Sequence, residues 1–172
     1  MADSAIITPA SANEDAFDIE PSPINLLFSK MLGQMVTVID REKEIDGVDI
    51  FDPAFKAWLS GAENALDAFT QSVCVLSNLS PMIASDVPLR RTARLIHAMI
   101  NAASRSELAT ARSNIVLYAG NLLDHEGAYI GRDTVGQLKR CRALLKVLMQ
   151  LDLYRHSPDD TLSNNEISEI AT

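Results

Sequence analysis

The feature that most constrains the fold of this chain is the helical spacing of its apolar residues, which is clearest between residues 52 and 80. Apolar side chains there recur every three or four positions and so share one face of an α-helix. The members of this face are Phe55, Trp58, Leu59, Ala62, Leu66, Phe69, Val73 and Leu76. We expect a helix of about 25 residues, roughly 38 Å long, that begins at Asp52-Pro53 and ends before Ser80. Its length leaves apolar surface beyond a compact bundle, which favours a homodimer.

Two further segments carry the same spacing and start near a proline. The first begins at Ser22-Pro23, where serine is a preferred capping residue and proline suits the first helical position. We expect this helix to stop before Gly47. The second helix follows Asp86 and Pro88. Each helix is apolar on one side only and therefore needs a neighbouring helix to cover that side.

The remaining two predicted helices lie in the second half of the chain. Ser104-x-x-Glu107 matches a capping box, in which the two side chains bond backbone N–H groups at a helix start. No glycine or proline separates this helix from the preceding one, so the two are either separate helices or one bent helix. The last helix follows a glycine-containing turn, and either Asp133 or Thr134 is expected to cap it.

Four or five amphipathic helices with short connections predict an all-α protein, a single helical bundle of the up-and-down type. Glycine and proline together make up 14 of 172 residues and aromatic residues 5%, which disfavours a β-sandwich or barrel. The bundle is expected to span residues 22–155. Residues 1–21 hold five acidic residues, residues 156–172 hold four, and neither segment contains lysine or arginine. Both are therefore predicted to be flexible acidic arms.

The cysteines and the first residues of the chain favour the cytoplasm as the compartment of this protein. Cys74 and Cys141 lie in apolar helical patterns, and we expect both to be reduced and packed rather than joined by a disulfide. The first residues carry Asp3 and only a short apolar run, unlike a signal peptide. No stretch approaches the ~18 apolar residues that span a bilayer. These features predict a soluble cytoplasmic protein with no membrane partner.

The acidic turn between the first two helices has some features of a calcium-binding loop. Glu42, Glu44 and Asp46 alternate, and Gly47 follows them. The loop would need a bidentate glutamate where the sequence has Pro53, so calcium is not expected. None of the three histidines stands in a Glu-x-x-His or His-Glu-x-x-His pattern. We therefore expect no metal and no cofactor.

Motifs of nucleophilic and nucleotide chemistry are also missing from the sequence. It has no Gly-x-Ser-x-Gly, no P-loop and no Gly-x-Gly-x-x-Gly, so we expect a protein that is not an enzyme. One histidine leaves a different possibility open. His97 follows Arg90 and Arg94 on the third predicted helix, and their charges could stabilise a phosphoryl group. A histidine phosphotransfer module is therefore one alternative function.

The formal charge of −8 is unevenly distributed along the chain. Residues 1–86 carry 4 basic and 14 acidic side chains, a net of −10, and residues 87–155 carry 11 basic and 5 acidic ones, a net of +6. Residues 156–172 add −4. A basic face suits an anionic partner. The predicted basic face on the third and fifth helices consists of Arg90, Arg94, Arg132, Lys139, Arg142 and Lys146.

Two charged residues fall inside apolar stripes. Arg112 lies in the stripe of the fourth predicted helix, and Asp152 lies in that of the fifth. A buried charge needs a partner, and a buried pair can fix the register of two helices. We therefore predict a buried ion pair between Arg112 and Asp152.

Together these features predict a protein–protein interaction module, such as an adaptor, a regulator or a chaperone-like factor. Its partner would be an acidic protein, or the acidic arms of the chain would fold back over the basic face as an intramolecular competitor. The first alternative is a regulator that binds nucleic acid through the basic face, although few aromatic residues lie among the basic ones. The second alternative is the phosphotransfer module built on His97.

Overall fold

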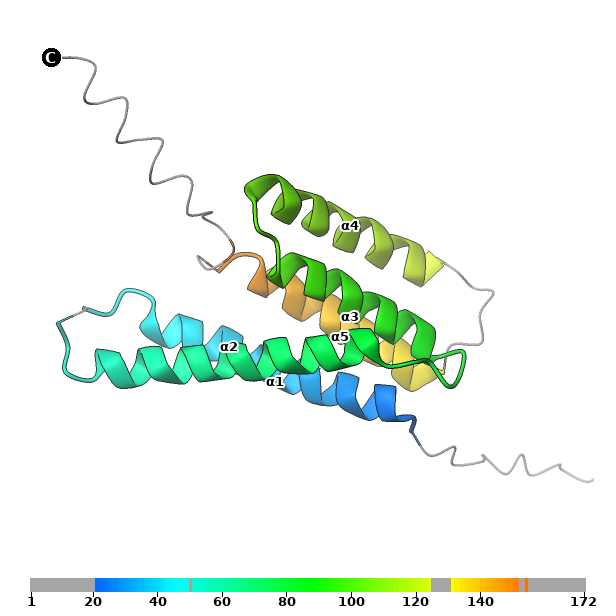
Figure 1. The fold of residues 1–172 in the computed structure, drawn as a ribbon, viewed down its shortest axis with the longest axis horizontal. Helices are drawn as coiled ribbons and strands as arrows, with labels where there is room; N and C mark the ends of the chain where they lie inside the picture. The colour runs from blue at the N-terminus through cyan, green and yellow to red at the C-terminus, as the bar shows by residue number, and fades with distance from the viewer. Residues whose placement is uncertain (1–20, 50, 125–130, 152–153, 155–172) are drawn as a thin grey trace, which may run out of the picture.

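The computed structural model describes residues 21–49, 51–124, 131–151 and 154, and in this part of the chain every regular element is an α-helix (Figure 1). The fold is an all-α helical bundle, as predicted, and the third and fourth helices are separate. The five helices are α1 (Pro23–Ile45), α2 (Phe55–Asn78), α3 (Asp86–Ile100), α4 (Arg105–Asp124) and α5 (Arg132–Leu148).

The start of α1 agrees with the sequence-based prediction. The Ser22 side chain accepts a hydrogen bond from the backbone N–H of Asn25 at 3.1 Å, and Pro23 occupies the first helical position. The helix ends at Ile45, and Gly47 follows with a φ of +74°, a backbone conformation that glycine adopts without strain. Local chemistry therefore sets both ends of this helix.

The predicted start of α2 at Asp52-Pro53 was wrong by two to three residues. The Asp52 side chain accepts a hydrogen bond from the N–H of Ala54 at 2.7 Å, and its carbonyl accepts one from the N–H of Phe55 at 2.9 Å. Asp52 thus closes a turn before the helix, which is a common use of aspartate. The helix itself begins at Phe55 without a side-chain cap.

The predicted cap of α5 was also wrong. The residue before the helix is Gly131, and no side chain caps the first turn. Asp133 and Thr134 lie inside that first turn, and the side chain of Thr134 is buried. The carboxylate of Asp133 is instead placed near the positive end of the helix dipole, which is favourable without a capping bond.

The capping box at the start of α4 is confirmed. Ser104 Oγ accepts the N–H of Glu107 at 3.2 Å, and Glu107 Oε2 accepts the N–H of Ala103 at 2.9 Å. The glutamate bond goes to the residue before the serine rather than to the serine itself. Both bonds satisfy N–H groups near the start of a helix, and this explains why α3 and α4 are two helices.

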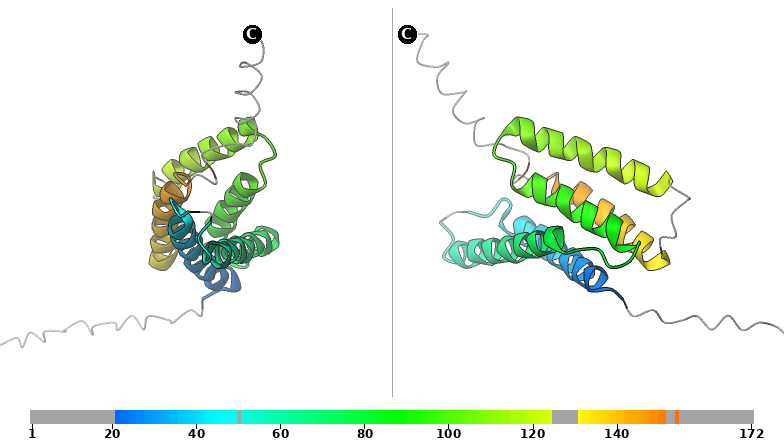
Figure 2. Two further views of the ribbon diagram at one scale, coloured as in Figure 1. Left: turned by 90° about the vertical axis from the view of Figure 1, so that its left-hand side faces the viewer. Right: turned by 45° about the vertical axis from the view of Figure 1, so that its right-hand side comes forward.

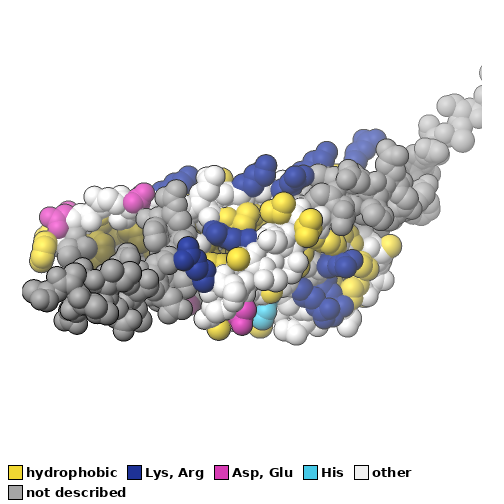
Figure 3. Space-filling model, turned by 90° about the horizontal axis from the view of Figure 1, so that it is seen from above, with side chains coloured by type: hydrophobic (Ala, Val, Ile, Leu, Met, Phe, Trp, Pro, Cys, Tyr) yellow, Lys and Arg dark blue, Asp and Glu magenta, His cyan; other side chains and the backbone are white. Residues whose placement is uncertain are grey.

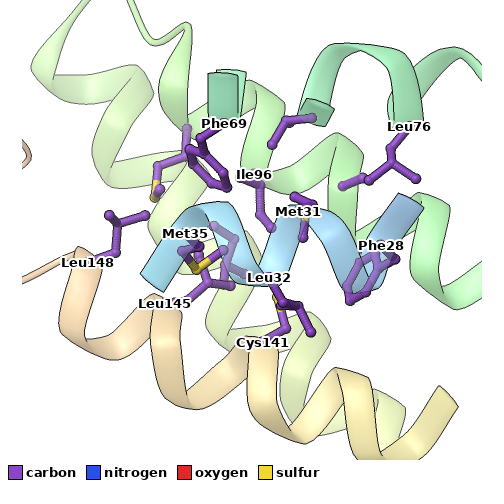
Figure 4. Packing of buried hydrophobic residues seen from close by; sticks show 14 of the residues in the cluster. Phe28, Met31, Leu32, Met35, Phe69, Leu76, Ile96, Cys141, Leu145 and Leu148 are labelled. Carbon is purple, nitrogen blue, oxygen red and sulfur yellow. The ribbon is translucent and has the colours of Figure 1, made fainter. Parts of the chain in front are cut away.

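The core is built around α1, which packs against α2, α3 and α5 (Figure 4). Phe28, Met31, Leu32 and Met35 point from α1 into the bundle and are fully or almost fully buried. Full burial of side chains of this kind stabilises a fold by roughly 1.5–3 kcal/mol each. The central position of α1 agrees with the strong apolar stripe in its sequence.

The helix α4 forms an outer layer of the bundle and packs mainly against α3 (Figure 2). Of its side chains that the structure describes, Ala111 and Ile115 are buried, whereas Val116 is 60% exposed and Leu117 66% exposed. The apolar residues of α4 lie on more than one side of the helix, and α3 covers only one of them. Part of its apolar surface therefore faces outward.

A buried carboxylate ties the start of α1 to the start of α3. Asp86 is 1% exposed and accepts hydrogen bonds from the Ser22 hydroxyl and from the backbone N–H groups of Met82 and Ile83. The two N–H bonds measure 2.9 and 3.2 Å. These three bonds join the α2–α3 connection to the residue that caps α1.

The two cysteines are both free, as predicted, but they differ in burial. Cys141 is 1% exposed in the core, while Cys74 is exposed on the outer side of α2. The prediction that both are packed was therefore wrong for Cys74. In the described part of the chain, no helix combines the length and the apolar character that crossing a membrane requires.

Candidate interaction site

Two residues of the predicted basic face contact the end of α2. The Nε atoms of Arg90 and Arg94 donate hydrogen bonds to the carbonyl oxygen of Ser77, at 3.4 and 3.2 Å. Ser77 lies in the last turn of α2, where carbonyl groups lack a partner within the helix and carry the negative end of its dipole. These two arginines therefore stabilise the fold, and their charges are partly used within it.

A third arginine of α3 joins α3 to α4. The guanidinium of Arg91 lies over the ring of Tyr118, 4.8 Å from its centroid. Burial raises the pKa of the Tyr118 hydroxyl, and the nearby Arg91 charge lowers it in part. The contact is a cation–π interaction, typically worth about 0.5–1 kcal/mol at a partly exposed site.

Arg112 reaches from α4 to the end of α5. Its Nη2 donates hydrogen bonds to the carbonyl oxygens of Met149, at 2.6 Å, and Tyr154, at 2.8 Å. The predicted partner, Asp152, lies outside the described residues, so the ion pair stays a prediction. The structure places Arg112 beside the end of α5, where backbone carbonyls accept its hydrogen bonds.

The basic residues of α5 have a different environment. Lys139, Arg142 and Lys146 are exposed and make no hydrogen bond or ion pair with the residues that the structure describes. Their spacing places them on one side of the helix, with Arg142 and Lys146 one turn apart. Figure 3 shows lysine and arginine side chains gathered on the face that carries α4, with hydrophobic side chains between them.

Arg132 belongs to the same side of α5 but lies at its start. It borders a shallow hollow between α1 and α5, together with Ser29, Gln137 and Arg140. The six basic residues predicted from the sequence thus form no single site. Two contact the end of α2, three line one side of α5, and one lies two turns before them.

Beside the α5 cations is an apolar cavity of about 90 Å³ between α3, α4 and α5. Arg142 and Lys146 also border it. An apolar cavity of about 150 Å³ holds one benzene molecule, so this one accommodates a single aliphatic side chain. Its main apolar lining residues are Leu95, Ile115, Val116, Leu138, Leu145 and Met149.

The thiol of Cys141 lies at the same cavity, and its environment argues against nucleophilic chemistry. Burial raises the pKa of Cys141 to about 12, so the thiol is protonated near neutral pH. Only the thiolate is an effective nucleophile or metal ligand. Cys141 therefore acts as a small apolar group in the lining of the cavity.

A second, more polar hollow lies where the end of α1 meets the end of α5. Glu42, Asp46 and Gln150 border it. Burial raises the pKa of Glu42. The pKa of Tyr154 is raised to about 12, first by burial and then by the negative charge of Glu42. The negative charge of Glu42 thus opposes ionisation of the Tyr154 hydroxyl.

The remaining candidates from the sequence acquire no further support. His97 is half-buried and borders none of the cavities described above. Its carbonyl accepts a hydrogen bond from the side chain of Asn101, which closes the end of α3. Within the described ranges, no three His, Cys, Asp or Glu side chains come together as a metal site would require.

The fold and the site define the class of molecule: an all-α bundle with an apolar cavity, bordered by two cations that have no partner among the described residues. Comparison of the chain with models of protein families, with curated proteins and with solved structures found no match. The sequence showed the α5 cations but not the cavity. Val116, which lines the cavity and lies outside the main stripe of α4, was the feature of the sequence that could have indicated it.

Proposed function

We propose that this protein is a protein–protein interaction module that binds an acidic segment of a partner carrying an exposed aliphatic side chain. The observation that carries the proposal is the position of Arg142 and Lys146, which border the apolar cavity and have no partner among the described residues. On this proposal the protein binds rather than catalyses, as an adaptor or regulator in the cytoplasm.

The chemistry of the site supports both parts of this ligand. Burial of one leucine or isoleucine side chain in the cavity contributes roughly 1.5–3 kcal/mol. Carboxylates beside that side chain would meet Arg142 and Lys146, and charge-assisted hydrogen bonds are stronger than neutral ones. The apolar contact selects the position of the segment, and the charges increase the rate of association.

The test uses a short fluorescent peptide of glutamates with one central leucine, titrated into the full chain by fluorescence anisotropy. We expect Arg142→Glu with Lys146→Glu to weaken binding by at least about tenfold, and leucine-to-serine in the peptide to do the same. The matched control is Lys30→Glu with Lys43→Glu, which changes the net charge equally on exposed positions of α1. Equal losses in both protein variants would refute the site.

One observation favours a second candidate function, the binding of nucleic acid. Lys139, Arg142 and Lys146 form an exposed row with a spacing that could follow phosphates. Arg90 and Arg94, which the sequence assigned to the same face, already bond Ser77 and contribute less to such a surface. A short DNA duplex that displaces the peptide, together with equal binding of the leucine and serine peptides, would favour this candidate.

The homodimer predicted from the length of α2 is also a proposal. Phe51 is 84% exposed before α2, and Leu59 and Val75 are partly exposed along it. Leu59 and Val75 lie on nearly opposite sides of the helix, so a dimer through α2 would use the side of Leu59 together with Phe51. Sedimentation equilibrium of the full chain, compared with Phe51→Ser and Leu59→Ser, tests this proposal because a dimer through α2 requires both side chains.

A further inference from the structure

We propose that the C-terminal segment, residues 156–172, docks at the α3–α4–α5 cavity of its own chain and competes there with the acidic partner. This inference rests on the proposed function, because it assigns an internal ligand to the same site. On this inference, the acidic segment of the protein inhibits binding of the partner.

The first observation is the place where the chain leaves the described structure. Tyr154 is buried, and its carbonyl accepts a hydrogen bond from Arg112 Nη2. The same nitrogen bonds the carbonyl of Met149, a residue that lines the cavity. Val116, one helical turn after Arg112, lines it too. The last described residue before the segment therefore lies close to the cavity lining.

The second observation is the chemistry of the segment. It carries Asp159, Asp160, Glu166 and Glu169 and no lysine or arginine. Its two isoleucines each follow a glutamate, as Glu166-Ile167 and Glu169-Ile170. An aliphatic side chain next to a carboxylate is the ligand that the cavity and its two cations require.

The length of the segment is sufficient for this contact. About 13 residues separate Tyr154 from Ile167, and a chain of that length spans up to roughly 43 Å when extended. The part of α5 that lines the cavity runs from Leu138 to Met149, or roughly 17 Å at the rise of an α-helix. Either isoleucine can thus reach the cavity without strain in the connection.

The N-terminal arm is also acidic, but its attachment differs. It joins the bundle at Ser22, whose hydroxyl donates to the buried carboxylate of Asp86. The C-terminal segment instead follows Tyr154, whose carbonyl shares the Arg112 donor with that of Met149. Met149 lines the cavity and Ser22 does not, so the place of attachment favours the C-terminal segment as the occupant and makes the N-terminal arm a natural control.

Tethering makes even weak docking effective. A segment tethered within the same chain has an effective concentration at its binding site of up to the millimolar range. A partner must displace it, so the full chain binds acidic peptides more weakly than the isolated site would. Salt reduces this difference, because it screens the contact between exposed charges.

The first experiment neutralises the segment within the full chain, through Asp159→Asn, Asp160→Asn, Glu166→Gln and Glu169→Gln. We expect the glutamate–leucine peptide to bind this variant at least about tenfold more tightly than the unchanged chain at low salt. The control neutralises Asp3, Glu14, Asp15, Asp18 and Glu20 in the same way, and its affinity should change by less than about twofold. Equal affinities of the unchanged chain and the C-terminal variant would overturn the inference.

The second experiment detects docking without any peptide. A benzophenone amino acid in place of Ile167 is irradiated in the full chain, and the adduct is mapped by mass spectrometry. We expect adducts on α4 and α5 residues that line the cavity, lost in the chain with Arg142→Glu and Lys146→Glu. The same group in place of Ile19 is the control and should not label the cavity. Adducts absent from the cavity would refute the docking.

The two experiments separate the inference from the function on which it rests. A cavity adduct in a protein whose neutralised variant fails to bind the peptide supports the docking and refutes the proposed ligand class. Peptide binding that neutralisation leaves unchanged, without a cavity adduct, supports the function and refutes the internal competitor.

Discussion

Arg94 on α3 and Arg142 on α5 are both exposed arginines on helix surfaces, yet they have different roles. Arg94 donates to the carbonyl of Ser77 at the end of α2, whereas Arg142 borders an apolar cavity and has no partner among the described residues. A helix end within reach of one guanidinium accounts for the difference. Arginines that look equivalent in the sequence therefore fall into two groups. The guanidinium of one group bonds another part of the fold, and that of the other group is available to a ligand.

The largest effect on stability is expected at Arg112 of α4, which, like Arg94, bonds backbone carbonyls elsewhere in the fold. Its replacement by methionine leaves the carbonyls of Met149 and Tyr154 without their charged donor. We expect Arg112→Met to lower the free energy of unfolding by about 3 kcal/mol, measured by urea denaturation. Arg142→Met is the matched control and should change it by less than about 0.5 kcal/mol. Similar losses in both variants would break the comparison.

The next largest effect is expected at the cations that border the cavity, and it should change binding but not stability. We expect Arg142→Gln with Lys146→Gln to weaken binding of the glutamate–leucine peptide about tenfold, or ~1.4 kcal/mol. The urea midpoint should stay unchanged, because neither residue bonds another described residue. A loss of stability without a loss of affinity would reverse the assignment of roles.

A smaller effect is expected from the arginines at the end of α2. Arg90→Gln with Arg94→Gln removes two charge-assisted bonds to one carbonyl, at 3.4 and 3.2 Å. These bonds are long and partly exposed, so we expect a loss of only about 1 kcal/mol in unfolding free energy. Peptide affinity, measured by anisotropy, should change by less than about twofold. A large loss of affinity would place these arginines in the binding site after all.

The smallest effect on stability is expected at a carboxylate, Glu42, which is partly buried at the end of α1. Burial raises the folded-state pKa of Glu42 above its usual value of 4.5, so the folded protein binds the proton more tightly than the unfolded chain. Glu42→Gln should therefore stabilise the protein slightly near neutral pH. The gain should shrink as the pH falls through the raised pKa and vanish below the unfolded value. Thermal unfolding across this range provides the measurement, and a gain that grows in acid would contradict the shift.

The sequence predicted the features that depend on neighbouring residues. The five helices, the Ser22 cap and the Ser104–Glu107 capping box follow from spacing and local hydrogen bonding, and the structure agrees with them. The predicted caps of α2 and α5 were wrong, because Asp52 closes a turn and Gly131 precedes α5. Several residues can begin a helix, and local sequence does not decide between them.

The site was only partly predictable for a different reason. Lys139, Arg142 and Lys146 share one side of α5 by spacing alone, and the sequence identified them. The contacts of Arg90 and Arg94 with Ser77 depend on where α2 ends in space, and the cavity depends on the packing of three helices. Such tertiary features do not appear in the periodicity of any single segment.

The outer position of α4 has a consequence for the motions of the protein. Only Ala111 and Ile115 of its described side chains are buried, and Arg91 and Arg112 supply its main polar contacts with the rest of the bundle. Detachment of α4 would leave the side chains of α1 that fill the core in place, so it should require less free energy than global unfolding. Amide hydrogens of α4 should then exchange with solvent before those of α1. A ligand bound between α4 and α5 would slow that exchange, because it would stabilise the attachment of α4 to the bundle.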